Sequence, residues 1–225
     1  MGPLARTAAP ETSRTLFWAV VASTAGFFVA ISVVQLAFRP TMEHRMTDWA
    51  LVSVVGTEAV MGLIWVPRLA RRSWTMRCVT LPFTRRDAVD GLALAIAAYF
   101  AYLWSFMMVS ATIPELARAA RGFHVAGSVS LWAAVLLSVL NPVAEEFLYL
   151  GFVANALRRE GMGFALSASI VTRVLVHLYQ GPIALIANVP FGGILAVYYL
   201  RSGRIWPAVL AHGLLDFVAL AMLLR

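Results

Sequence analysis

Residues 128–157 read SVSLWAAVLLSVLNPVAEEFLYLGFVANAL, an apolar stretch that contains two adjacent glutamates in its second half. About 20 apolar residues in helical form are enough to cross the hydrocarbon core of a bilayer. This stretch is longer than one straight crossing, and Asn141-Pro142 lies near its middle, just before Glu145 and Glu146. Because proline removes a hydrogen bond from a helix interior, we expect a kink or a break there.

Six further stretches are apolar enough to span, and they lie at 16–38, 49–66, 91–111, 161–179, 182–200 and 205–224. Across the 225 residues, 61% are hydrophobic and 13% are charged, whereas soluble domains carry about 25% charged residues. This composition excludes a soluble globular protein. We therefore predict an all-α, polytopic transmembrane bundle of about seven helices that forms one integral-membrane domain, 1–225. Residues 112–127, with Pro114 and two glycines, suit a connecting loop or a short interfacial helix.

The arginines indicate an orientation. All 18 basic residues are arginine, and the loops on the amino-terminal side carry twelve of them against five on the opposite side. The positive-inside rule then places the amino terminus in the cytoplasm. The absence of lysine is typical of a GC-rich bacterial genome, so we expect a multi-pass protein of the bacterial inner membrane. The first apolar run exceeds a signal-peptide core and is interpreted as an uncleaved helix.

The positive charge, +7, predicts an anionic lipid surface as a partner. The loop at 67–86 carries six arginines together with Trp74 and Phe83, which suits contact with lipid headgroups. Nucleic-acid binding is not expected, because no basic stripe with interleaved aromatic residues is present. The lone Cys78 lacks metal-ligand spacing and a disulfide partner, and nothing in the sequence indicates an oligomeric state.

Ionisable residues inside the spans mark the candidate site. Each such group costs about 2.5–3.5 kcal/mol on insertion scales, so a functional role is the default interpretation. The first three spans contain only Glu58, which we interpret as a packing or interfacial acid. The last four contain Glu145, Glu146, Arg173, His177, His212 and Asp216.

Helical spacing sorts these residues into faces. His177 follows Arg173 by four residues and Asp216 follows His212 by four, so each pair shares a helix face. Adjacent glutamates point about 100° apart, so Glu145 and Glu146 cannot point at the same atom, and we expect one to face the site and the other a supporting partner.

A glutamate beside two imidazoles can activate water, because it supplies a base together with donors for an oxyanion. Peptide hydrolysis inside the membrane fits this set, but ion pairs that only fix helix register fit it as well. Glu145, His177 and His212 also resemble a zinc-binding set of two histidines and one glutamate. The chain has no H-E-x-x-H motif for a zinc protease, and no serine or aspartyl intramembrane-protease motif.

Three motifs, NPVAEEFLYLG at 141–151, HLYQG at 177–181 and HGLLD at 212–216, resemble those of the CAAX protease and bacteriocin-processing family. This family includes type II CAAX prenyl endopeptidases and bacterial Abi proteins, which act as glutamic intramembrane proteases. The motifs occur in the family's order on separate spans, so the resemblance places a CAAX protease-like core at 128–224.

The resemblance implies a role for each site residue. Glu145 would be the general base, assisted by His177, while His212 and Asp216 would line the oxyanion side and Glu146 would support them. The resemblance also implies that no metal and no cofactor is needed.

Two positions depart from the family pattern. Leu150 stands where the family has arginine, and Arg173 stands where it has phenylalanine. We interpret both as one change, in which the cation that neutralises Glu146 has moved to the next span as Arg173. The alternative is a decayed site in a pseudoprotease.

Several functions therefore remain open. The substrate of the enzyme would be a membrane-associated peptide or protein, such as a leader peptide, a carboxyl-terminal sorting signal or a CAAX-like end. A non-catalytic scaffold or immunity protein, a zinc-dependent membrane protease and a proton-coupled carrier are the alternatives. A carrier should show repeated interrupted helices, and we find none in the sequence.

Overall fold

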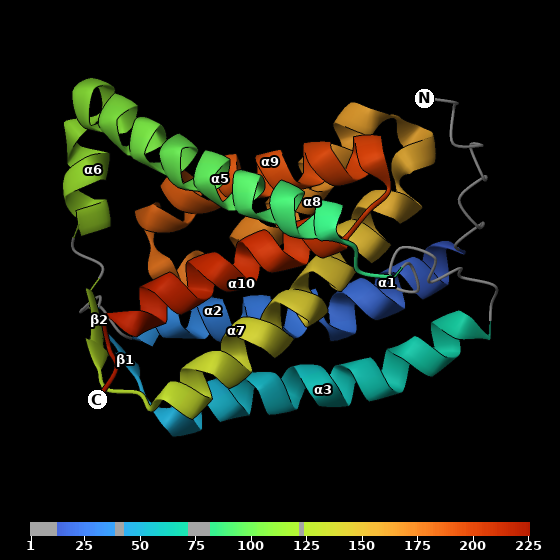
Figure 1. Cartoon of the computed structure of the whole chain (residues 1–225), viewed down its shortest axis with the longest axis horizontal. Coiled ribbons are helices and arrows are strands. Elements are labelled where there is room, and N and C mark those ends of the chain that lie inside the picture. Colours follow the sequence, from blue (N-terminus) through green and yellow to red (C-terminus); the bar gives the residue numbers. More distant parts are fainter. Residues whose placement is uncertain (1–12, 39–42, 72–81, 122–123) are drawn as a thin grey trace.

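The computed structural model describes residues 13–38, 43–71, 82–121 and 124–225 (Figure 1). Its α-helices are α1 (Arg14–Ser23), α2 (Ala25–Phe38), α3 (Asp48–Ala70), α5 (Arg85–Thr112), α6 (Pro114–Arg121), α7 (Leu131–Glu146), α8 (Met162–Val176), α9 (Pro182–Ser202) and α10 (Trp206–Ala221). A π-helix, η1 (Phe147–Ala154), continues α7, and two 3-10 helices, η2 (Arg158–Glu160) and η3 (Leu178–Gln180), flank α8. The strands are β1 (Glu43–Met46) and β2 (His124–Gly127).

Within the described residues, five helical segments are long and apolar enough to cross a membrane: Arg14–Phe38, Asp48–Ala70, Arg85–Thr112, Leu131–Ala154 and Pro182–Ser202. The other two predicted spans are the apolar but shorter helices α8 and α10, of 15 and 16 residues. At 1.5 Å per residue each is about 23 Å long, less than the hydrocarbon thickness of about 30 Å. The chain is a multi-pass membrane protein, and the predicted all-α bundle is confirmed.

Helix α10 lies inside the bundle, where it packs against α5 on one side and α7 on the other (Figure 1). Helix α3 covers the outer side of α7, and α9 packs against both α5 and α8. Helix α2 contacts α8 and η3. Helices α2, α3 and α5 thus cover parts of the last four apolar segments, so polar groups on the covered faces can be shielded from lipid.

A small parallel sheet closes one end of the bundle, and the sequence did not predict it. Strand β1 pairs with β2 in a register that runs from Glu43↔His124 to Met46↔Gly127. At the same end Asp48, the first residue of α3, accepts hydrogen bonds from the Ser130 backbone N–H and from Arg225 Nη2, each at 2.7 Å. These contacts tie the starts of α3 and α7 to the carboxyl terminus. The predicted connection at 112–127 contains a short helix, α6, followed by β2.

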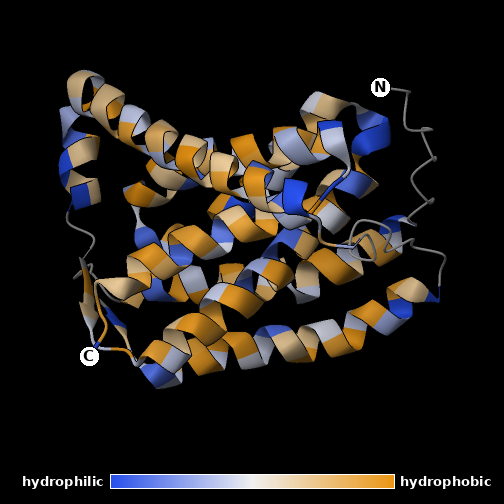
Figure 2. Ribbon diagram, in the orientation of Figure 1, coloured by the Kyte–Doolittle hydropathy of each residue, from blue (hydrophilic) through white to orange (hydrophobic). Residues whose placement is uncertain are grey.

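The opposite end carries most of the described arginines. Thr84 and Asp87 form a capping box at the start of α5, and Arg204 donates from Nε and Nη2 to both oxygens of Asp87. This ion pair joins α5 to the connection between α9 and α10. Nine described arginines lie at this end and four at the sheet end, and apolar residues fill the region between (Figure 2). Which end faces the cytoplasm remains a prediction.

The stretch that contains the glutamates is not broken. Pro142 lies inside α7, which continues without a loop into η1. Since Pro142 has no N–H, the Ser138 carbonyl lacks its helical donor. Gly213 of α10 packs against that carbonyl so closely that a Cβ would overlap the Ser138 oxygen. The predicted break is therefore absent. The irregularity is a π-helix directly after the glutamates, together with a close contact between α7 and α10.

Candidate active site

The six ionisable residues predicted from the sequence form one network between α7, α8 and α10. Glu145 and Glu146 are the last residues of α7, and Arg173 lies in the last turn of α8. His177 caps the end of α8, while His212 and Asp216 lie one turn apart on α10. Pairwise distances of 2.7–3.9 Å connect all six. The structure therefore brings together every residue of the predicted site.

Of the two adjacent glutamates, Glu146 is the one that other side chains hold by short hydrogen bonds. Its side chain is fully buried, and Nη2 of Arg173 donates to both of its oxygens at 2.7 Å. His212 Nδ1 lies 2.7 Å from the same carboxylate. A buried carboxylate needs compensation of this kind, because its desolvation costs several kcal/mol. Glu146 is thus held in place by two other helices and has little capacity left for a substrate.

Arg173 bridges the two glutamates. Its guanidinium lies between the rings of Tyr149 and Phe191, 4.4 and 4.9 Å from their centroids. Its Nη1 is 3.7 Å from a Glu145 oxygen, and its side chain passes Gly192, where a Cβ would lie only 3.2 Å from Arg173 Cδ and Nε. Arg173 is 1% exposed. The prediction that this arginine pairs with Glu146 is confirmed, and Gly192 allows α8 and α9 to pack closely at this point.

Glu145 differs from Glu146 because it lacks a direct hydrogen bond from either imidazole. Its Oε1 lies 3.9 Å from His177 Nε2, and its Oε2 lies 3.9 Å from His212 Nε2. Both distances exceed the hydrogen-bond range, and Oε2 is enclosed without a hydrogen-bond partner in the protein. The side chain is 12% exposed. Two imidazoles thus face one carboxylate across gaps that a water could bridge.

The two histidines have different surroundings. His177 Nδ1 lies 2.8 Å from the Arg173 carbonyl, which can only accept, so we assign the proton to Nδ1 and leave Nε2 as the acceptor of the neutral ring. His212 has carboxylate oxygens near both nitrogens, with Glu146 at Nδ1 and Asp216 Oδ1 3.5 Å from Nε2. The His212 ring also packs edge-on against Phe191, with 5.1 Å between ring centroids.

Leu150 lies in an apolar cluster. It is fully buried there with Leu195, Ala196 and Ala208, among residues of α5, α9 and α10. The backbone here belongs to η1, in which the hydrogen bonds run from i to i+5. The cation of the family's motif is absent from this position, and Arg173 contacts Glu146 from α8 instead.

Glu58 on α3 is a seventh ionisable residue near the site, and sequence reasoning set it aside. Its carboxyl interacts electrostatically with those of Glu145 and Asp216, and its Oε2 is enclosed without a hydrogen-bond partner in the protein. Helix α3 packs against α7, which explains this proximity. Glu58 stands out in the sequence as a lone acid within an apolar span. Its proximity to the site could not be predicted, because the acids near it lie on other helices.

Among the residues that the structure describes, no group of three or more His, Cys, Asp and Glu side chains is arranged to hold a metal ion. The expectation of a metal-independent reaction remains a prediction.

Fold and site together define a polytopic helical membrane protein with a glutamate–histidine–arginine network buried among its last four apolar helices. A family model described as type II CAAX prenyl endopeptidase Rce1-like matches residues 127–218. This region, which contains α7 to α9 and the part of α10 that carries the site, is therefore similar to that protease family. Helices α1 to α6 lie outside the match. Searches of the curated proteins and of the solved structures gave no significant match.

Proposed function

We propose that this protein is an intramembrane endopeptidase that uses Glu145 as its general base and needs no metal. The observation that carries the proposal is the position of the Glu145 carboxylate, 3.9 Å from the Nε2 atoms of both His177 and His212. A water between these groups can give one hydrogen bond to the carboxylate and a second to His177 Nε2. A general base must lie within reach of the proton it abstracts, directly or through one water.

The reaction then follows from the residues. Glu145 takes a proton from the water, and the water oxygen attacks the carbonyl carbon of the scissile peptide. The oxyanion that forms accepts a hydrogen bond from His212 Nε2–H, which requires a doubly protonated His212 ring with Glu146 at its other nitrogen. Collapse of the intermediate breaks the C–N bond, and Glu145 returns its proton to the leaving amine.

Glu146 and Arg173 position the other groups in this scheme. Glu146 orients His212 through the 2.7 Å contact with Nδ1, and Arg173 neutralises the paired carboxylates. Asp216 limits the rotation of His212 from the same helix face. The substrate would be a membrane-associated peptide or protein, either a leader, a carboxyl-terminal sorting signal or a CAAX-like end.

Glu145→Gln tests the mechanism. The amide keeps the volume but cannot accept the proton, so we expect peptide processing in membranes of the producing cells to fall by about 10²–10⁴-fold. New peptide termini can be counted by mass spectrometry in cells that express either form at matched levels. Glu160→Gln, in the exposed η2 segment, is the control and should leave processing unchanged.

Full processing by the Glu145→Gln protein would refute the general base. If wild-type and Glu145→Gln membranes contain the same termini, the buried network is structural and a scaffold or immunity role is favoured. That alternative has one observation in its support, because Leu150 replaces the arginine of the family's motif.

Chelators test metal independence. Processing should persist in EDTA and in phenanthroline, because the proposed mechanism has no Lewis acid. Loss of processing in chelator, with recovery on addition of zinc, would instead identify a zinc-dependent protease.

A further inference from the structure

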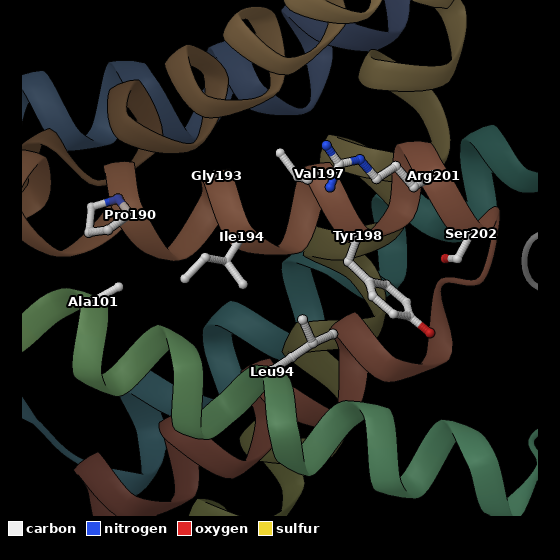
Figure 3. A pocket seen from close by; sticks show the side chains of 9 residues that line it. All are labelled: Leu94, Ala101, Pro190, Gly193, Ile194, Val197, Tyr198, Arg201 and Ser202. Atoms are coloured by element: carbon white, nitrogen blue, oxygen red, sulfur yellow. The ribbon is translucent and has the colours of Figure 1, made fainter.

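An open, apolar groove of about 660 Å³ runs between α5 and α9 on the outer side of the bundle (Figure 3). Leu94 and Ala101 of α5 face Ile194 and Tyr198 of α9 across it. The residues that line it are Leu94, Ala101, Pro190, Gly193, Ile194, Val197, Tyr198, Arg201 and Ser202. None of them belongs to the glutamate–histidine network, so the groove is separate from the candidate active site.

The length of the groove matches one leaflet of a bilayer. Along α9 it extends from Pro190 to Ser202, which at 1.5 Å per residue is about 18 Å. One leaflet contributes about half of the 30 Å hydrocarbon thickness. Since α9 spans nearly the whole thickness, the Ser202 end lies at the interface and the Pro190 end lies near the bilayer centre.

The interfacial end of the groove is cationic. Arg201 lies there in the last turn of α9, and no ion pair to it is found among the described residues. The nearby acids are already engaged: Asp90 accepts a hydrogen bond from the Tyr198 hydroxyl at 2.7 Å and lies 3.5 Å from Arg86, while Asp87 pairs with Arg204. An anionic group at Arg201 would therefore meet a positive charge, because the carboxylates nearby are already paired with other residues.

We propose that this groove binds an acyl chain of an anionic phospholipid from the leaflet at the arginine-rich end, with the lipid phosphate at Arg201. The apolar length, the one-leaflet depth and the cation at the interfacial end all fit this occupant. The inner end of the chain lies against Gly193, whose neighbour Gly192 packs against Arg173. The bound lipid thus supports the same turn of α9 that supports the arginine of the candidate site. This inference does not depend on the proposed catalytic function.

Charge recognition is tested with the full-length protein in nanodiscs of phosphatidylcholine with or without phosphatidylglycerol. Lipids that stay bound are counted by native mass spectrometry. Phosphatidylglycerol should be enriched on the wild type, and Arg201→Gln should weaken its retention by about fivefold, the effect expected of one arginine near an anionic surface. The control is Arg68→Gln on α3, which removes the same charge at the same end of the bundle away from the groove.

Occupancy of the groove is tested by filling it. Ala101→Phe should remove the retained lipid, whereas Ala93→Phe, at an exposed position of the same helix outside the groove, should not. Equal retention of both lipids by the wild type, or retained lipid that is insensitive to Arg201→Gln and Ala101→Phe, would overturn the proposal. Displacement of the lipid by a prenylated or acylated peptide would also overturn it, because the groove would then hold the substrate's chain.

Discussion

At the scale of single residues, Arg173 is a buried cation that depends on several partners at once. Its guanidinium is enclosed by two aromatic rings, a glycine and two carboxylates, and only the Glu146 side of it forms short hydrogen bonds. Cations held over aromatic faces gain stabilisation when they are desolvated. The same enclosure makes each partner dependent on the others, because a charge that loses its counter-ion here has no access to water.

Removal of Arg173 should therefore be costly. Arg173→Phe leaves Glu146 buried without its counter-charge, and we expect a loss of about 3–5 kcal/mol in the free energy of unfolding, measured by denaturation in detergent. Leu150→Arg added to Arg173→Phe should recover much of that loss if one cation can serve from either helix. The control Arg118→Gln breaks an exposed pair with Glu115 and should cost about 1 kcal/mol or less.

The double variant distinguishes two histories of the site. If the double variant is less destabilised than the sum of the two single variants predicts, the two positions are coupled. If Leu150→Arg with Arg173→Phe unfolds as readily as Arg173→Phe alone, the two departures from the family pattern are unrelated.

At the scale of elements, the contact between α7 and α10 sets the geometry of the site. Pro142 frees the Ser138 carbonyl and Gly213 lies directly against it, so the two helices approach more closely than side chains would allow. His212, the residue before Gly213, is thereby brought to Glu146. A π-helix directly after the glutamates completes the local irregularity, and such segments are frequent at functional sites.

Gly213→Ala should disturb this contact. The new methyl group overlaps the Ser138 oxygen, so α7 and α10 must separate, at a cost of about 1–3 kcal/mol in unfolding free energy. Processing activity should fall as well, since His212 moves away from Glu146. Gly62→Ala on α3 is the matched control: nothing lies within 4 Å of the Cβ that the substitution adds, so the variant should be neutral or slightly stabilising. Equal effects of both variants would show that the close approach is unimportant.

Most of the helices and their shared faces could be predicted from the sequence. Apolar runs located each span, and the spacing of four residues correctly paired His212 with Asp216 on one face. The π-helix could not be predicted, because its backbone pattern depends on tertiary packing. The sheet was missed since each strand has only four residues and its partner lies about eighty residues away. Glu58 was set aside because the acids near it lie on other helices.

At the scale of the whole molecule, the arginines divide the bundle into two unlike ends. Nine described arginines lie at the end where α5 begins and four at the sheet end. Cytoplasmic loops of membrane proteins carry such an excess. We therefore predict that the arginine-rich end, together with the amino terminus, faces the cytoplasm and that the carboxyl terminus lies on the other side.

Reporter fusions in a bacterial host measure this orientation. Alkaline phosphatase, which is active only outside the cytoplasm, should be active when fused after Arg225 and inactive when fused at the amino terminus. A fluorescent protein at the same two positions is the reciprocal control and should give the opposite pattern. Phosphatase activity at the amino-terminal fusion would invert the predicted topology.

The ion pair between Glu146 and Arg173 also constrains how the chain is made. Arg173 follows Glu146 by 27 residues and His212 follows it by 66. At synthesis rates of about 5–20 residues per second, the glutamate waits about 1–5 s for its arginine and about 3–13 s for its histidine. During that interval α7 is an apolar helix with two uncompensated acids, which resists release into lipid. We therefore expect the insertion machinery to hold α7 until α8 has emerged, so that the two helices enter the bilayer as a pair.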